Sequence, residues 1–174
     1  ITFIAFFNPK SKYFIYFIRL WNVSSLKIYR LKIDLQGAEN HNPNESCIIV
    51  SNHQSLLDIP AAFYALGGNI RMVAKAELFK VPLFGFLLKK TGFIPIERGS
   101  RKSASEAVSK IRNLIAQKTH VWMAPEGTRS ADGKLLPFKR GAFIMSHDCE
   151  LPIQPIVIVN SGEITPKGSI LARP

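Results

Sequence analysis

Polar side chains that can do chemistry gather at three places in this sequence, each directly after a short apolar run. The first group is residues 51–58, with His53; the second is residues 97–100; and the third is residues 125–130. A histidine and carboxylates can move a proton, and arginines can hold an anion. The sequence therefore predicts one site with a general base beside an anion cradle, provided that the three groups meet in the fold.

His53 and Asp58 are the candidates for the base. On one continuous helix they would lie about 140° apart and could not pair. They can pair if His53 lies in a non-helical lead-in and Asp58 about one turn inside the helix that follows. The carboxylate would then fix the tautomer of His53 and raise the basicity of the other ring nitrogen. Taken alone, the spacing favours a plainer interpretation, a loop histidine and an aspartate at a helix N-terminus.

The anion cradle is predicted in the third group. Gly127, Thr128 and Arg129 offer backbone N–H groups, a hydroxyl and a guanidinium in consecutive positions, which suits phosphate. Arg98 precedes a predicted helix whose N-terminus adds a favourable dipole, and Lys139 adds positive charge. Any one of these loops, taken singly, also fits a solvated turn with incidental cations.

Glu126 stands among these cations, where an acid weakens anion binding unless it has a task. We expect it to accept a hydrogen bond from a substrate hydroxyl. We expect no metal site, because the four histidines, at positions 41, 53, 120 and 147, lack ligand spacing. Cys47 and Cys149 flank apolar runs and are interpreted as buried free thiols.

The elements that must position these residues are short apolar strands alternating with helices. Strands are predicted at 47–50, 70–74, 92–96, 121–124 and 153–159, and helices at 55–66 and 104–117, the latter capped by Ser103 with Glu106. Strands that are apolar throughout are typical of sheets covered on both faces. We therefore predict an α/β fold with a mostly parallel central sheet flanked by helices, and chemistry at the carboxyl ends of its strands.

The first part of the chain has a different character. Residues 1–36 mix apolar blocks, aromatic residues and cations, which favours an N-terminal helical segment at a membrane interface over an ordinary core helix. No run reaches the about 18 apolar residues of a spanning helix. The formal charge of +11 indicates an anionic partner. The chain begins with Ile1 and stops at Pro174, so we expect both natural ends to be incomplete.

The blocks together resemble the glycerolipid acyltransferases of the 1-acylglycerol-3-phosphate (lysophosphatidate) type. Residues 52–58 are similar to the catalytic N-H-x4-D block of that family, 92–98 to the block that ends in a substrate-binding arginine, and 125–130 with 136–141 to the third block. Residues 151–158 are similar to the fourth block, whose proline, here Pro155, shapes the site; Lys75 lies in a segment that also matches. Four blocks in order cover roughly residues 47–165.

The resemblance implies a function and a role for each residue. His53, oriented by Asp58, would deprotonate the free hydroxyl of 1-acylglycerol 3-phosphate for attack on acyl-CoA or acyl-acyl carrier protein, giving phosphatidate without an acyl-enzyme or a cofactor. Arg98, Arg129, Gly127 and Thr128 would bind the phosphate, and Glu126 would contact the glycerol. Lys75 and Lys139 would also belong to the substrate-binding residues. Residues 37–174 would form the acyltransferase domain, associated with the cytoplasmic face of a membrane, the inner membrane in a bacterium.

Other functions stay open at this stage. The acceptor can be another lysophospholipid or glycerol 3-phosphate, and the chain can be an acidic-lipid-binding module without activity. A nucleic-acid binder is disfavoured because the cations are scattered and no aromatic–basic recognition motif occurs. A metal-dependent hydrolase using His53, Asp58 and Glu126 would be sensitive to EDTA.

Overall fold

A parallel sheet forms the centre of the molecule. The computed structural model describes residues 12–67 and 69–169. Within them, the strands are β1 (Ile48–Ser51), β2 (Ile70–Lys75), β3 (Ile94–Ile96), β4 (His120–Met123) and β5 (Ile153–Ile156). Their order across the sheet is β3-β2-β4-β1-β5, and every neighbouring pair is parallel. The predicted α/β fold with a parallel central sheet is therefore confirmed.

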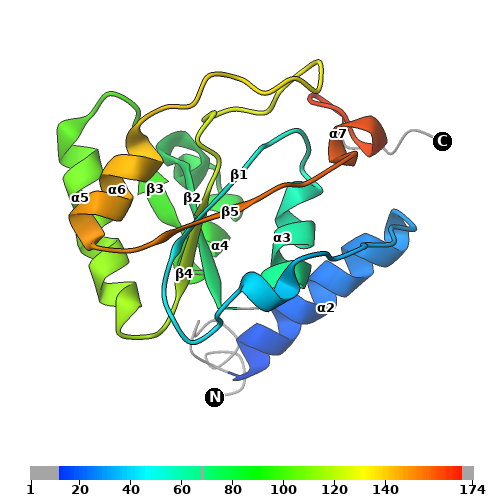
Figure 1. The fold of residues 1–174 in the computed structure, drawn as a ribbon, viewed down its shortest axis with the longest axis horizontal. Coiled ribbons are helices and arrows are strands. Elements are labelled where there is room, and N and C mark those ends of the chain that lie inside the picture. Colours follow the sequence, from blue (N-terminus) through cyan, green and yellow to red (C-terminus); the bar gives the residue numbers. More distant parts are fainter. Residues whose placement is uncertain (1–11, 68, 170–174) are drawn as a thin grey trace.

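Helices cover both faces of this sheet (Figure 1). They are α2 (Lys12–Ile28), α3 (Asp58–Leu66), α4 (Phe84–Lys90), α5 (Arg101–Ile115), α6 (Gly141–Cys149) and α7 (Ser161–Ile164), with short 3-10 turns η1 (Ala38–Asn40) and η2 (Ala76–Lys80). One core lies between the sheet and α5 with α6, and a second lies between the sheet and α3. The helix α2 packs against the outer side of α3.

The apolar strands are explained by these two cores. Ile48 and Val50 of β1 pack toward α5 and α6, whereas Ile49 between them packs toward α3. In β4, Val121 lies on the first face and Trp122 on the second. Alternate side chains of a strand point to opposite faces, so both sets must be apolar. The same two cores bury Cys47 and Cys149 as free thiols, as predicted.

The structure corrects several predicted boundaries. The helix predicted from residue 55 begins at Asp58, because residues 54–57 turn around the Asp58 carboxylate. The strand predicted to run to residue 159 ends at Ile156. The helix cap is also different: Ser100 caps α5 by accepting the N–H of Ser103, and the hydroxyl of Ser103 instead accepts the N–H of Glu97.

The predicted boundary at residue 36 falls in the extended connection between α2 and η1. Residues 1–11 of the predicted membrane-interface segment lie outside the described residues. Among the described helices, none combines the length and the apolarity that crossing a bilayer requires. The assignment of residues 1–36 to a membrane interface stays a prediction.

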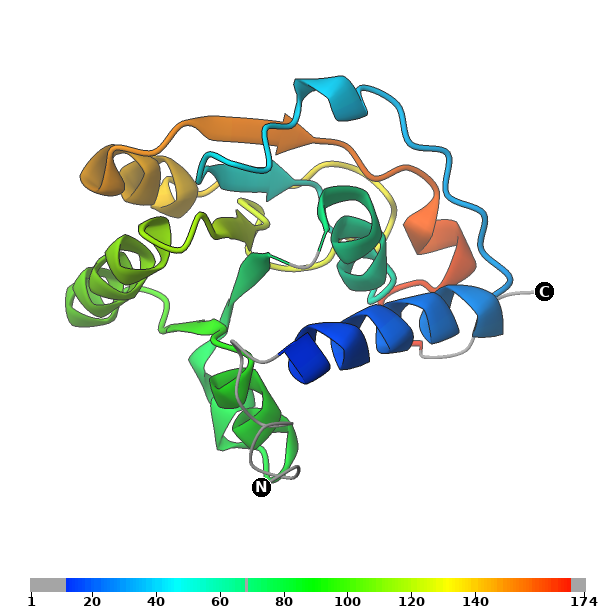
Figure 2. The ribbon, with the colours of Figure 1, turned by 90° about the horizontal axis from the view of Figure 1, so that it is seen from below.

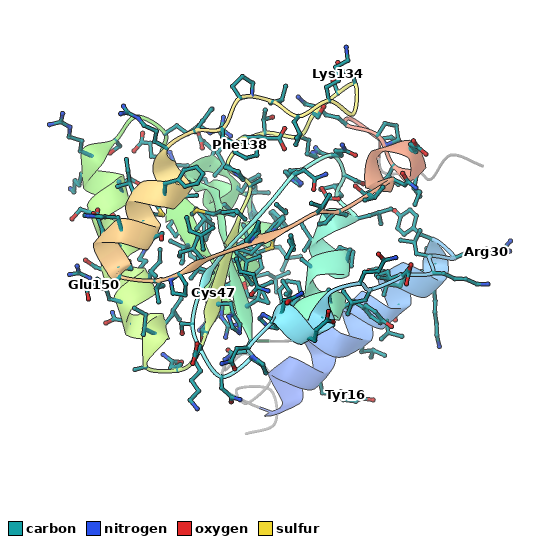
Figure 3. All side chains as sticks on the ribbon, viewed as in Figure 1. Tyr16, Arg30, Cys47, Lys134, Phe138 and Glu150 are labelled. Carbon is teal, nitrogen blue, oxygen red and sulfur yellow. The ribbon has the colours of Figure 1, made fainter. Side chains whose placement is uncertain are left out.

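Because all of the strands are parallel, their carboxyl ends meet at one edge. The segments that leave this edge are residues 52–57 after β1, 97–100 after β3 and 124–140 after β4. Figure 3 places Lys134 and Phe138 at this edge, while Cys47 lies toward the opposite end of the sheet. The fold thus brings the three predicted polar groups to the same side of the molecule.

Candidate active site

His53 and Asp58 form a hydrogen-bonded pair at the carboxyl end of β1. The distance from His53 Nδ1 to Asp58 Oδ2 is 2.7 Å. His53 lies in the non-helical segment after β1, as predicted, but Asp58 is the first residue of α3 rather than one turn inside it. The intervening residues form a tight turn, which lets the two side chains face each other. The predicted pairing is present in the fold.

The Asp58 carboxylate is the centre of this turn. Its side chain is fully buried, and Oδ2 also accepts the backbone N–H groups of Gln54, at 2.8 Å, and Ser55, at 3.0 Å. Burial raises the pKa of Asp58, but the hydrogen bonds from His53, Ser55 and Gln54, together with the nearby Ser161 hydroxyl, outweigh it and lower the pKa below the ordinary value. The Ser161 hydroxyl is buried beside the carboxylate, although the contact falls short of a well-formed hydrogen bond. Asp58 is therefore ionised at neutral pH.

The backbone of His53 is held from the loop that follows β4. The N–H of His53 donates to Glu126 Oε1 at 2.9 Å, and the N–H of Ser130 donates to the carbonyl of His53 at 2.8 Å. On its other side, the imidazole meets the ring of Trp122 edge-on, with 5.8 Å between centroids. The side chain of His53 remains 20% exposed. The imidazole is thus fixed in place and still reachable by a substrate.

Glu126 has a structural task that sequence reasoning did not foresee. It is only 2% exposed, and its second oxygen, Oε2, accepts the N–H of Leu136 at 2.8 Å. One buried carboxylate therefore joins the His53 segment to residues 126–136. Its predicted contact with the glycerol of an acceptor stays a prediction.

The predicted anion cradle lies next to this carboxylate. Gly127 has a φ of +71°, and a Cβ built on it would lie 3.3 Å from the side chain of Lys139. Lys139 is itself anchored by its N–H, which donates to the carbonyl of Pro125 at 2.8 Å. The Nη1 atom of Arg129 is buried and has no hydrogen-bond partner in the described part of the chain. Thr128 is exposed. The loop thus presents cations beside a backbone turn whose positive φ favours glycine at position 127.

Lys75 and Arg98 lie further along the same edge. Lys75 ends β2 and pairs with Glu77 at 3.2 Å, with both side chains about half exposed. Arg98 is exposed and follows β3, which is separated from β1 by β2 and β4. At about 4.8 Å between adjacent strands, β3 and β1 are roughly 14 Å apart. The structure therefore places Arg98 at the same edge as His53 but does not bring the two into contact.

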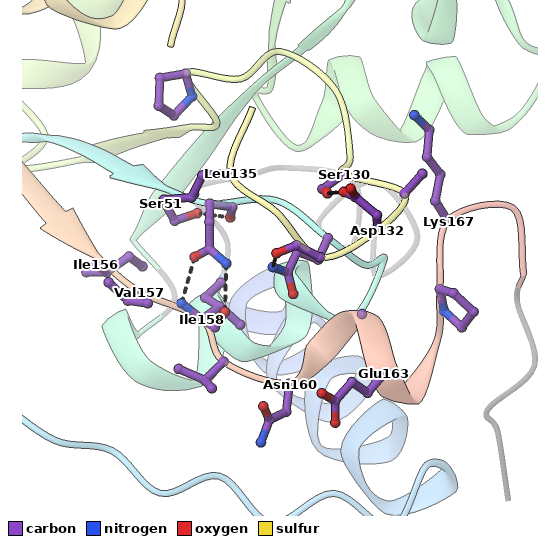
Figure 4. A pocket seen from close by; sticks show the side chains of 18 of the residues that line it. Ser51, Ser130, Asp132, Leu135, Ile156, Val157, Ile158, Asn160, Glu163 and Lys167 are labelled. Atoms are coloured by element: carbon purple, nitrogen blue, oxygen red, sulfur yellow. Dashed lines mark hydrogen bonds between the residues drawn. The ribbon is translucent and has the colours of Figure 1, made fainter. Parts of the chain in front are cut away.

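Pro155 lies on the edge strand β5 and lines a cavity beside the segment that contains His53. This cavity has a volume of about 720 Å³ and is largely apolar. Figure 4 shows Ile156, Val157 and Ile158 along one side and Ser130 and Asp132 across from them. A proline is tolerated in β5 because an edge strand need not donate every N–H. The cavity is deep enough to hold part of a lipid-sized ligand.

Asn52 also lines this cavity, and its role was not predicted. Its amide donates to the carbonyl of Ile158 at 2.7 Å and accepts the N–H of Ile158 at 2.8 Å (Figure 4). This pair of bonds continues the pairing of β1 with β5 beyond the last strand residue. The sequence signal was present, since Asn52 belongs to the N-H-x4-D block. Ser161 in α7 had no such signal, because only the tertiary fold brings it to Asp58.

Metal ligands do not gather in the described part of the chain: no group of three or more His, Cys, Asp or Glu side chains there could hold a metal ion. The site consists of a base, its carboxylate partner and cations. Such an arrangement can deprotonate a hydroxyl and bind an anionic group.

The sequence of this chain is similar to those of known acyltransferases. A model of the family described as "Acyltransferase" matches residues 32–159. The chain is 36% identical over 170 residues to the chloroplastic 1-acyl-sn-glycerol-3-phosphate acyltransferase BAT2 of Brassica napus, covering 96% of this chain and 48% of that protein. It is 35% identical over 142 residues to the human 1-acyl-sn-glycerol-3-phosphate acyltransferase alpha, covering 81% of this chain and 50% of that one.

A solved structure agrees with these relatives. The crystal structure of the 1-acyl-sn-glycerophosphate acyltransferase PlsC from Thermotoga maritima has a TM-score of 0.76 and 29% sequence identity, covering 91% of this chain and 63% of that one. The chain spans about half the length of the curated relatives described above. The family match contains the whole segment from β1 to β5, including the His53–Asp58 pair and the loop after β4. On these grounds the chain belongs to the acyltransferase family.

Proposed function

We propose that this protein transfers a fatty acyl group from acyl-CoA or acyl-acyl carrier protein to the free hydroxyl of 1-acylglycerol 3-phosphate, giving phosphatidate. The observation that carries the proposal is the 2.7 Å contact between His53 Nδ1 and Asp58 Oδ2, at the sheet edge where the cationic loops gather. The activity for which the relatives are named supports the same acceptor.

The proposed mechanism follows from the direction of that contact. Ionised Asp58 accepts a hydrogen bond from the Nδ1–H group of His53. The other ring nitrogen, Nε2, therefore carries the lone pair that takes a proton from the acceptor hydroxyl. The oxygen attacks the thioester carbonyl, and the tetrahedral intermediate collapses with cleavage of the carbon–sulfur bond. The imidazolium then returns its proton to the departing thiolate. Because the acceptor is the nucleophile, no acyl-enzyme and no cofactor are required.

Neither hydroxyl near the base is needed as a nucleophile. Ser55 is fully buried, and its hydroxyl is hydrogen-bonded to Thr165. Thr128 is exposed in the cradle, where we assign it to phosphate binding. This arrangement supports direct transfer.

The phosphate of the acceptor would be held by the cradle. The unpaired Nη1 of Arg129 and the turn at Gly127 and Thr128 supply donors, with Lys139 close by. Arg98 and Lys75 add positive charge further along the edge, and Glu126 would contact the glycerol. The apolar cavity beside Asn52, shaped in part by Pro155, would take an acyl chain.

Such an acceptor resides in a bilayer, so we also propose that the protein works on the cytoplasmic surface of a membrane. In α2, Tyr16, Leu20 and Val23 are 68%, 51% and 43% exposed, at a spacing that places them on one side of the helix. Tyr16 lies on the outer side of α2 (Figure 3). Lys27 and Arg30 follow and are also exposed. This pattern suits an interfacial helix.

The test offers the purified protein a panel of lysolipids with acyl-CoA and with acyl-acyl carrier protein, while thiol release is measured. We expect the fastest release with 1-acylglycerol 3-phosphate. His53→Ala should slow release by about 10²- to 10⁴-fold, the usual contribution of a general base. His147→Ala is the matched control, because His147 is an exposed histidine on α6.

Three results would overturn the proposal. Equal thiol release by His53→Ala and the unsubstituted protein would exclude His53 as the base. Binding of acidic lipids with no thiol release from any donor would instead support the lipid-binding module. Loss of activity in EDTA would point to a metal-dependent reaction.

A further inference from the structure

Apolar side chains are exposed in an unusual concentration on the segment between β2 and β3. We define the η2–α4 patch as the large apolar residues of this segment that are at least 39% exposed: Leu78, Val81, Leu83, Phe84, Phe86 and Leu87. Leu83 is the most exposed of them, at 75%. Large apolar side chains exposed together on one short segment indicate an interaction site.

The patch is built on an ordered scaffold rather than on a loose loop. Phe79 of η2 and Leu88 of α4 are buried beneath it, each 7% exposed. Gly85 lets α4 approach η2 so closely that a Cβ at this position would lie 2.2 Å from the carbonyl oxygen of Phe79. The fold therefore separates the apolar residues of this segment into a buried set and an exposed set.

The tip of the segment holds Leu83 in a strained conformation. Leu83 has a φ of +59° and a ψ of −54°, and the N–H of Phe84 donates to the carbonyl of Pro82 at 2.6 Å. These values describe a γ-turn with a positive φ, a rare turn for a leucine. Strain of this kind tends to persist where it serves a function. Here it presents the most exposed apolar side chain of the patch.

The charges around the patch select the partner. Lys75, Lys80, Lys89 and Lys90 are all exposed, and Glu77, the single acid between residues 75 and 90, is paired with Lys75. Lys90 Nζ also lies 5.6 Å from the centre of the Phe86 ring. Apolar side chains flanked by lysines match the boundary of a bilayer that contains anionic lipids, where apolar groups insert and cations meet the headgroups.

The position of the patch links it to the site. Figure 2 shows η2 and α4 projecting from the body below the sheet, on the same side of the view as α2. The segment leaves β2 at its carboxyl end, directly after Lys75, and β3 beside it ends just before Arg98. The η2–α4 segment thus starts from the edge at which the acceptor phosphate is proposed to bind.

We propose that the η2–α4 patch inserts shallowly into the surface of a bilayer containing anionic lipids and seats the reactive edge of the sheet against it. This inference rests on the proposed function, because the membrane is where the acceptor lipid resides. It can nevertheless be tested by measuring vesicle binding, without any catalytic assay.

The first experiment places a fluorophore that reports polarity at the tip of the patch. Leu83→Cys is labelled and mixed with vesicles of phosphatidylcholine alone or with phosphatidylglycerol added. Ile144→Cys, half exposed on α6, is the control. The native thiols Cys47 and Cys149 are buried, which restricts labelling to the new position. We expect a blue shift for Leu83→Cys with the anionic vesicles and none for the control. Unchanged emission at position 83, or equal shifts at both positions, would overturn the proposal.

The second experiment separates the membrane from other partners. Leu83→Ser with Phe84→Ser should weaken sedimentation with anionic vesicles at least about tenfold, because two large apolar side chains no longer insert. Phe143→Ser with Ile144→Ser, on α6, should leave it unchanged. Thermal melts establish that both double variants are folded. If the first variant does not fold, the labelled Leu83→Cys protein decides alone.

The outcomes distinguish this proposal from the catalytic one. With a short-chain acceptor that is monomeric in water, Leu83→Ser with Phe84→Ser should keep its rate, whereas with acceptor in vesicles it should lose it. Loss of activity only with acyl-acyl carrier protein, at unchanged vesicle binding, would assign the patch to an acidic protein partner. A concentration-dependent dimer that the variant abolishes would assign it to a second copy of this chain. Either result would contradict a membrane role while leaving His53 as the base.

Discussion

The carboxylate of Glu126 contacts the backbone of His53 through a hydrogen bond. Oε1 of Glu126 accepts the N–H of His53 at 2.9 Å, while Oε2 accepts the N–H of Leu136 at 2.8 Å. These two hydrogen bonds explain why an acid occurs among cationic residues. Glu126 joins the segment after β1 to the loop after β4, and this role needs no substrate. This single buried carboxylate therefore fixes the position of His53 relative to the loop after β4.

Replacement of Glu126 tests this role. Glu126→Gln keeps one acceptor oxygen but places an NH₂ group opposite the other N–H, so the free energy of unfolding should fall by about 1–3 kcal/mol. Urea denaturation would measure the loss, and steady-state kinetics would show a lower kcat because His53 is less well held. If Glu126 contacts only the acceptor glycerol, stability should be unchanged and KM alone should rise.

The Asp58→Asn variant tests the orientation of the base. The carboxamide of asparagine has one acceptor oxygen in place of two, so it holds the Nδ1–H group of His53 less firmly. It also carries no negative charge to stabilise the imidazolium. We expect kcat to fall by about 10²- to 10⁴-fold, measured as thiol release. Circular dichroism should show a folded protein, since the buried site keeps its shape. Activity near that of the unsubstituted protein would contradict the role assigned to the pair.

The lowered pKa of Asp58 also predicts a pH dependence of stability. The contribution of a group whose pKa is lowered on folding is complete above its unfolded pKa, about 4 for aspartate, and is lost as the pH falls through the folded-state pKa. Between pH 6 and pH 2.5, the free energy of unfolding should therefore decrease more for the unsubstituted protein than for Asp58→Asn. Parallel curves in urea titrations at each pH would contradict this expectation.

Alanine substitution at two glycines with similar φ values can distinguish the effect of backbone strain from an effect on substrate binding. Gly127 and Gly133 have φ values of +71° and +77°, so Ala at either position should cost about 1–2 kcal/mol of stability. Only at Gly127 would the new Cβ press on Lys139. We expect KM for lysophosphatidate to rise in Gly127→Ala and to stay unchanged in Gly133→Ala. Equal kinetic effects would mean that Lys139 does not contribute to binding.

The buried cysteines should be unreactive in the folded protein. Burial raises the pKa of Cys47 to about 11, so little thiolate exists at pH 8. Labelling with iodoacetamide, followed by mass spectrometry, should be at least about tenfold slower without denaturant than in concentrated urea. As the pH rises from about 9 toward 11, the stabilisation that comes from keeping this thiol protonated should be lost. Rapid labelling of Cys47 in the folded protein at pH 8 would contradict the burial.

Much of the architecture could be predicted from local sequence. Runs such as residues 121–124 and 47–50 are apolar at every position, which requires cover on both faces and hence a parallel sheet between helices. Such a sheet puts the residues that follow each strand at one edge. The types of group at the site, and the edge that carries them, therefore follow from the order of residues along the chain.

The remaining features depend on contacts between distant segments. The strand order places β4 between β2 and β1, which puts Glu126 beside His53 and leaves Arg98 two strands further away. Ser161 reaches Asp58 across 103 residues of sequence, and Asn52 pairs with Ile158, 106 residues away. Local patterns cannot encode these pairings, because they arise only when the sheet assembles and buried polar groups must find partners. The sequence by itself determined which groups can react; tertiary burial decided which of them are paired and which are left open to a substrate.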